Sequence, residues 1–189
     1  ATKMSSNAQA AAIWGAGQES YHPDDLCRAL GISASRASEA VTELVDRGLA
    51  RRERRERRVI AFPVAADLLL SEHMAEFSSP VSKVVFARKA PRIDRLTDAG
   101  ETALAARSML AAPSMEQKAV LRSAWRGLRD LEVAEGELPD SETTMIQVWR
   151  YAPVFADSSR IDDISLALSL AAIDDERIQL ELDRMFGKE

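Results

Sequence analysis

The sequence predicts a mainly helical protein with one small β element, and three observations support this. Amphipathic or Ala-rich segments, each bounded by a capping residue or a glycine, recur through most of the 189 residues. One short stretch, residues 49–62, instead combines β-branched residues and arginines in a strand-like pattern. The composition, 46% hydrophobic and 29% charged, is that of a folded globular chain.

Two short helices are expected at the start of the chain. Residues 7–17 form an Ala-rich segment that ends at a glycine. The next helix begins at Pro23, a residue suited to the first helical position, and two aspartates follow in the first turn. Their negative charge suits the positive end of the helix dipole. Gly31 ends this second helix.

A third helix and a hairpin follow. Ser33 or Ser35 can cap the helix, which stops at Gly48. Residues 49–53 and 57–62 then form two strand-like pieces on either side of a charged turn. We therefore expect a β-hairpin there.

Three short helices followed by a hairpin is the element order of a winged helix-turn-helix. Gly31 permits the tight turn between the second and third helices. Ile32 and Val41 are apolar where these two helices must pack, and Ala37 is small where they cross. The sequence therefore predicts a winged helix-turn-helix over residues 1–62.

The residues "LGISASRASEAVTELVDRGLARR" closely resemble the DNA-binding segment of bacterial MarR-like winged-helix regulators. That family often reads leucine, glycine, an apolar residue and serine, and later "L…RGL" before basic residues. The resemblance covers residues 7–62. The segment "RIDRLTDAGETAL" also resembles the end of a wing in that family, but it lies some 35 residues after the first wing. Residues 81–104 are therefore either part of a second winged element or an insertion.

A helix fits the major groove of B-DNA, and the exposed residues near its N-terminus reach the base edges. The base-reading candidates are Ser35, Arg36, Glu39 and Thr42. Arg36 can make a bidentate contact to guanine, and Glu39 can accept from cytosine. Ser33 and Ser38 are expected to bond phosphates. The hairpin would follow the backbone or enter the minor groove with Arg51, Arg52, Arg54, Arg55, Arg57 and Arg58.

Each of these assignments has an alternative. An Arg-rich hairpin is often a solvated surface, and Glu53 and Glu56 would partly neutralise this one by cross-strand pairing. Arg36 could instead pair with Glu39 on the surface of its helix.

The rest of the chain is predicted to be mostly helical. A linking helix starts at Pro63, residues 81–87 and 143–151 are strand-like, and Thr97 can cap a helix that runs to about residue 112. Residues 114–136 give the strongest helical pattern in the chain, with a capping-box spacing and an apolar face around Trp125.

Two further helices are expected near the C-terminus. Asp162 or Asp163 caps an apolar helix at residues 164–173, and Asp174 caps the last helix. The predicted regions are thus 1–62 for DNA binding, 63–112 for the link and a wing-like element, and 113–189 for dimerisation or partner binding.

Charge is distributed unevenly along the chain. Residues 1–62 carry ten Lys and Arg against eight Asp and Glu, whereas residues 108–189 carry nine against sixteen. A basic face at one end is compatible with the overall charge of −5. The acidic C-terminal region favours contact with a protein partner, and its helices near Trp125 and at the end are candidate surfaces of a homodimer.

Several kinds of site are not indicated. His22 and His73 have no Cys or carboxylate partners at ligand spacing, and Cys27 suits a small buried residue. The acids at 162–163 and 174–176 fit helix capping better than Mg²⁺ binding. No phosphate loop or nucleophile elbow occurs, so we expect no enzyme, metal or cofactor. The longest apolar run is too short for a membrane span, and we expect a cytoplasmic protein.

The sequence therefore predicts a regulator, expected to be a repressor, that binds double-stranded DNA through its N-terminal region. The alternative is a winged-helix protein-interaction module of a larger assembly, such as an antitoxin or a chromosome-maintenance subunit. The acidic C-terminal half motivates this alternative.

Overall fold

The computed structural model describes residues 2–188, and their contacts divide the chain into two units. The first unit comprises the residues up to Ser78 together with Phe155–Ser159. The second comprises Ser79–Val154 and the residues from Arg160 onward. The finer division at residues 62 and 112 stays a prediction. No helix of the described residues is long and apolar enough to cross a membrane.

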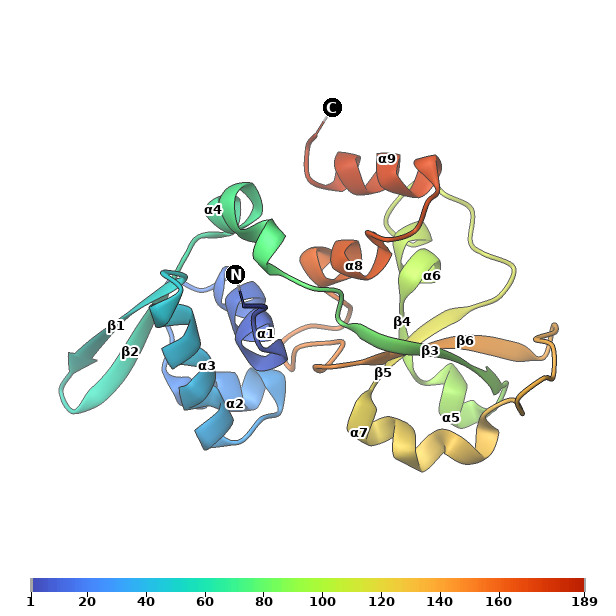
Figure 1. Cartoon of the computed structure of the whole chain (residues 1–189), viewed down its shortest axis with the longest axis horizontal. Coiled ribbons are helices and arrows are strands. Elements are labelled where there is room, and N and C mark those ends of the chain that lie inside the picture. The colour runs from blue at the N-terminus through green and yellow to red at the C-terminus, as the bar shows by residue number, and fades with distance from the viewer. Residues whose placement is uncertain (1, 189) are drawn as a thin grey trace. The chain divides into compact units, whose positions relative to one another are not determined.

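Three helices open the first unit: α1 (Ser6–Gly15), α2 (Pro23–Leu30) and α3 (Ala34–Asp46) (Figure 1). Each begins at a side-chain cap. The caps are Ser5, His22, which forms a capping box with Asp25, and Ser33. Helices α1 and α3 contact each other, and the small alanine side chains that they bury, such as Ala11 and Ala37 at 0% exposure, suit close packing.

The hairpin follows α3 directly. Strand β1 (Ala50–Arg55) pairs antiparallel with β2 (Arg58–Pro63), and Arg55 lies opposite Arg58. The two-residue turn between them has positive φ angles, 48° at Glu56 and 68° at Arg57. Both values suit the tight turn that matches strand twist, although neither residue is a glycine. The predicted hairpin is confirmed.

A third short segment extends this ribbon. Tyr21 forms an isolated antiparallel bridge with Ala61, with N–O distances of 3.0 and 2.8 Å. The bridge ties the loop before α2 to the base of the hairpin. The sequence did not predict it, because a single bridging residue has no alternating pattern.

The predicted linking helix is short and irregular. It consists of α4 (Ala66–Leu68), the short π-helix η1 (Leu69–His73) and the 3₁₀-helix η2 (Met74–Glu76). Its end is held to α3, because Arg47 forms ion pairs with Glu43 at 3.1 Å and with Glu76 at 3.6 Å.

The second unit contains a four-stranded sheet. Its strands are β3 (Val81–Arg88), β4 (Thr97–Asp98), β5 (Gln117–Leu121) and β6 (Thr143–Trp149), in the order β3-β6-β5-β4. Strands β5 and β6 run parallel, and the other neighbours are antiparallel. The strands predicted at 81–87 and 143–151 are confirmed. Because β3 and β4 lie at opposite edges, residues 81–104 do not form a hairpin like the first wing.

One face of the sheet carries an apolar core under α5 (Pro91–Asp94), α7 (Arg122–Trp125) and η3 (Arg126–Leu131) (Figure 1). The core consists of Ala87, Ile93, Val120, Trp125, Ile146 and Val148. The long helix predicted at 114–136 is therefore wrong, since its first part is β5. Because β5 is buried along its length, Gln117 to Leu121 show no alternation of apolar and polar residues, and its apolar residues also fit helical spacing. Trp125 is 1% exposed, so its ring offers no dimer surface.

The opposite face carries α6 (Gly100–Ala105) and α8 (Asp163–Leu170), and α9 (Glu176–Met185) packs on α8. Thr97 lies in β4 rather than at a helix cap, and α6 ends well before residue 112. Asp162 caps α8 and Asp175, not Asp174, caps α9. The C-terminal region is thus a mixture of helices and sheet rather than mostly helical.

Candidate nucleic-acid interface

Helix α3 separates its residues into a packed side and an open side. Its buried residues are Ala37, Ala40, Val41 and Leu44. Near its N-terminus the exposed polar residues of the helix are Ser35, Arg36, Ser38 and Glu39, all of which the sequence singled out. The structure therefore places these four predicted base or phosphate contacts on one accessible end of one helix.

Arg36 is available for an external partner. Among residues 2–188 its side chain has no hydrogen bond or ion pair. The alternative pairing with Glu39 is absent there, since Glu39 accepts instead from the Ser35 hydroxyl at 3.2 Å. The guanidinium of Arg36 is thus exposed and uncompensated at the start of the helix.

Two other predicted residues are already used within the unit. The Ser33 hydroxyl oxygen accepts from the Arg36 backbone N–H at 3.3 Å and so caps α3. Thr42 is half-buried, and its Oγ1 accepts from Arg52 Nη1 at 2.9 Å. This second bond joins α3 to the first strand of the hairpin, so the hairpin is held in a defined place beside the helix.

One face of the hairpin carries a partly compensated cluster, in which two arginines share one carboxylate. Arg51 and Arg55 both pair with Glu53, the second at 2.8 Å. Their guanidinium carbons lie over the ring of Phe62, at 4.4 and 5.3 Å from its centroid. Glu53 thus neutralises arginines two residues away on its own strand rather than across the hairpin. Sequence reasoning missed Phe62, which lies opposite Arg51 in the register of the hairpin.

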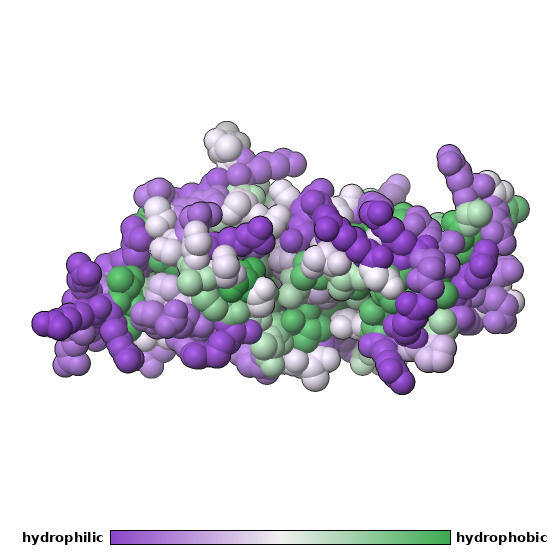
Figure 2. All heavy atoms as spheres, turned by 90° about the horizontal axis from the view of Figure 1, so that it is seen from below, coloured by the Kyte–Doolittle hydropathy of each residue, from purple (hydrophilic) through white to green (hydrophobic). Residues whose placement is uncertain are grey.

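Three arginines of the hairpin have no side-chain partner among residues 2–188, whereas Arg52 bonds the neutral hydroxyl of Thr42. Arg54, Arg57 and Arg58 are exposed, and within the described part of the chain none of them has a side-chain partner. Figure 2 shows hydrophilic side chains gathered over the hairpin end of the first unit, at the left of the view. Free positive charge is therefore concentrated at the turn and on the outer positions of the strands.

Glu43 and Arg47, near the C-terminal end of α3, form an ion pair. Burial alone would raise the pKa of Glu43, but hydrogen bonds from Ser5 and Arg47 outweigh this effect and hold that pKa below its usual range. The exposed arginines of α3 and the hairpin that have no side-chain partner are thus Arg36, Arg54, Arg57 and Arg58, among the residues that the structure describes.

The described residues hold no group of three or more His, Cys, Asp or Glu arranged to bind a metal ion. The acids noted in the sequence act as caps: Asp162 accepts from the Ser165 N–H at 2.7 Å, and Asp175 from the Arg177 N–H at 2.9 Å. At the exposed end of α3 and on the hairpin, the first unit offers hydrogen-bonding side chains and positive charges.

Comparison with known proteins agrees with this geometry. The model of the MarR family matches residues 16–58, which include α2, α3 and β1. The resemblance seen in the sequence is thus confirmed for this segment, and the match does not extend to the second unit. No curated protein and no solved structure matches the chain.

Proposed function

We propose that the protein is a transcriptional regulator that binds double-stranded DNA sequence-specifically and acts as a repressor. The family match over residues 16–58 supports DNA binding and regulation. The observation that carries the proposal is the exposed polar end of α3 beside a hairpin with three arginines that have no side-chain partner among the described residues.

In this proposal α3 lies in the major groove and its N-terminal end reads the base edges. Arg36 donates two hydrogen bonds to guanine, a contact worth about 1–3 kcal/mol of discrimination. Glu39 accepts from a cytosine amino group after releasing the Ser35 hydroxyl, which is then free to bond a base or phosphate. Thr42 has a different role, because its hydroxyl holds Arg52.

The hairpin supplies affinity rather than sequence information. Arg54, Arg57 and Arg58 contact phosphates or enter the minor groove, where uncompensated guanidinium groups are favoured. Arg51 and Arg55, stacked on Phe62 and paired with Glu53, stiffen the ribbon that presents them. Ser33 and Ser38 bond the backbone next to the helix, since a serine hydroxyl can donate to phosphate while its oxygen accepts elsewhere.

The proposal includes a homodimer and no enzymatic activity. Two helices that read two half-sites multiply a modest affinity for one half-site. A repressor of this kind acts by occupying the duplex, so it requires no metal or cofactor. Light scattering of the purified chain checks the dimer.

Selection from random duplexes tests the sequence specificity. The native chain is expected to enrich one short motif, and Arg36→Ala is expected to lose one guanine from that motif while keeping its affinity for random duplex. The matched control is Arg28→Ala, which removes an exposed arginine from α2 and should leave the motif unchanged. If the native chain enriches no motif, the claim of sequence-specific readout is wrong.

A second candidate, a protein-interaction module, is favoured by one feature of the second unit. Leu180 on α9 is 51% exposed, and Ile173, which precedes α9, is 37% exposed. Acidic residues accompany them in 174–183. An exposed apolar pair with acidic neighbours suits a partner with a basic rim. Co-purification of one basic protein at fixed stoichiometry, lost in Leu180→Ser, supports this candidate; a chain that purifies alone opposes it.

A further inference from the structure

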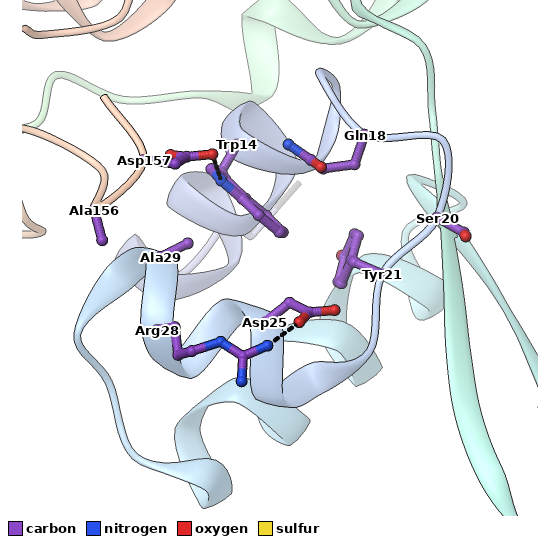
Figure 3. A pocket seen from close by; sticks show the side chains of 9 residues that line it. All are labelled: Trp14, Gln18, Ser20, Tyr21, Asp25, Arg28, Ala29, Ala156 and Asp157. Atoms are coloured by element: carbon purple, nitrogen blue, oxygen red, sulfur yellow. Dashed lines mark hydrogen bonds and ion pairs between the residues drawn. The ribbon is translucent and has the colours of Figure 1, made fainter. Parts of the chain in front are cut away.

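A cavity of about 470 Å³ lies in the first unit, away from the base-reading residues of α3 (Figure 3). It is bounded by the end of α1, the loop before α2 and one side of α2, and Ala156 and Asp157 complete its wall. These two residues belong to the first unit despite their late position in the sequence, and the Ala156 N–H donates to the Ala29 carbonyl at 3.0 Å.

Two aromatic rings form the apolar part of the wall. Trp14 and Tyr21 meet edge to face, with centroids 5.3 Å apart and an interplanar angle of 68°. Gly15 makes this arrangement possible, because a Cβ at that position would lie 3.0 Å from Cε1 of Tyr21. Tyr21 is 3% exposed, and burial raises the pKa of its phenol hydroxyl to about 12. The side chain therefore stays protonated and uncharged.

The charges around the cavity do not cancel. Arg28 pairs with Asp25, whose other carboxylate oxygen accepts a hydrogen bond from the backbone N–H of His22 at 2.9 Å. Asp157 accepts only a neutral hydrogen bond from Trp14 Nε1 at 3.2 Å, and no cation of residues 2–188 pairs with it. Figure 3 shows this carboxylate beside the Trp14 ring, with the Asp25–Arg28 pair on α2. The lining therefore has one excess negative charge next to two aromatic rings.

We propose that this cavity binds a small organic cation with an apolar body, of the alkylammonium or arylammonium class. Aromatic faces attract cations, and a carboxylate beside them adds a charge-assisted hydrogen bond. An anion is disfavoured, because Asp25 already occupies Arg28 and Asp157 repels it. The volume is within the range of small-molecule sites. This binding is separate from DNA recognition and does not depend on the proposed regulatory function.

Tryptophan fluorescence tests the proposal directly, because the three tryptophans differ in accessibility. Trp14 lines the cavity and is partly exposed, whereas Trp125 and Trp149 are 1% and 0% exposed in the second unit. Titration with benzylammonium is expected to change the emission saturably. Benzyl alcohol and benzoate, which share its shape but lack its positive charge, are expected to cause no saturable change at the same concentrations. Trp14→Phe should remove the signal.

Calorimetric titration of benzylammonium into three variants identifies the charges involved. Asp157→Asn is expected to weaken binding by about fivefold or more, since it removes the carboxylate. Arg28→Ala is expected to strengthen binding, because it frees Asp25. Glu19→Gln removes the same charge from the neighbouring loop outside the lining and should change nothing. Equal binding of the alcohol, or unchanged affinity in both Asp157→Asn and Arg28→Ala, overturns the proposal.

Discussion

The protein carries two exposed groups of arginines, and they differ in what surrounds them. The hairpin group, Arg54, Arg57 and Arg58, lies on a two-stranded ribbon in which only Ala61 is buried. The second group, which we call the arginine stripe, is Arg122, Arg126 and Arg129 on α7 and η3. No member of either group has a side-chain partner among the residues that the structure describes.

The stripe is explained by packing alone. The helical segment that carries the stripe buries Trp125 and packs Leu128 and Leu131 against the core. The three arginines, four and then three residues apart, form the solvent-exposed side of this amphipathic segment. The next eleven residues, 132–142, carry five acids and no Lys or Arg. The hairpin has no comparable core to cover. We therefore expect the hairpin group, which lies beside the accessible end of α3, to contact DNA, and the stripe not to contact it.

The largest effect is expected from damage to the second unit alone. In Gly100→Ala the new Cβ overlaps Oε1 of Gln117, which accepts from the Glu101 N–H at the start of α6, and φ at this position is 52°. We expect a loss of about 2–4 kcal/mol in the free energy of unfolding, measured with urea. Gly127→Ala is the control, because nothing lies within 4 Å of its added Cβ. DNA affinity of folded Gly100→Ala should equal that of the native chain, and a loss would show that the second unit takes part in binding.

The turn of the hairpin should separate stability from DNA affinity. Arg57 holds a φ of 68°, which a non-glycine residue adopts at a cost of about 1 kcal/mol. Arg57→Gly is therefore expected to raise the free energy of unfolding by about 1 kcal/mol and yet weaken duplex binding. Arg57→Ala should weaken binding equally without the gain in stability. A stabilised Arg57→Gly with full affinity would remove Arg57 from the interface.

The bond between Arg52 and Thr42 should affect the placement of the hairpin. Thr42→Val keeps the shape of the side chain and removes the acceptor of the 2.9 Å bond. We expect a loss of about 0.5–1 kcal/mol in duplex affinity, measured by anisotropy. Thr42→Ser keeps the hydroxyl and should bind like the native chain. Equal weakening in both variants would indicate packing rather than the hydrogen bond.

The smallest effect concerns pH and is confined to the first unit. Because the pKa of Glu43 is lowered in the folded state, its contribution to stability is present above the pKa of the unfolded state, about 4.3. That contribution is lost as the pH falls through the lower pKa that Glu43 has in the folded state. We expect less than about 1 kcal/mol, since the pair is partly exposed. Urea titrations of Glu43→Gln should show a flatter pH dependence below pH 5, and an unchanged profile would contradict this account.

The first unit could be predicted closely because its signals are local. Pro23 and Gly31 mark the ends of α2, Gly48 follows the end of α3, and the strand-like pattern of 49–62 indicates the hairpin. The roles of single hairpin residues were less predictable. The sequence does not determine which arginines pair with Glu53 or which of them lie over Phe62. Both depend on side-chain conformations.

The second unit was predicted less well because its sheet depends on distant pairing. Strand β5 lies between β4 and β6, yet residues 122–142 separate β5 from β6 along the chain. Its buried residues, including Lys118 bonded to Asp98 at 2.7 Å, were read as part of a helix. The cavity beside Trp14 was also unpredictable, because Asp157 reaches it from far along the sequence.

The most direct test of the central claim compares the two arginine groups with matched triple variants. Anisotropy of a labelled duplex is measured against NaCl concentration for the native chain, for Arg54→Ala/Arg57→Ala/Arg58→Ala, and for Arg122→Ala/Arg126→Ala/Arg129→Ala. Removing three phosphate contacts should reduce the slope of log K against log salt by about 3 in the hairpin variant. The stripe variant should keep the native slope. Equal slopes for the native chain and the hairpin variant, or an equal loss in the stripe variant, would contradict the account.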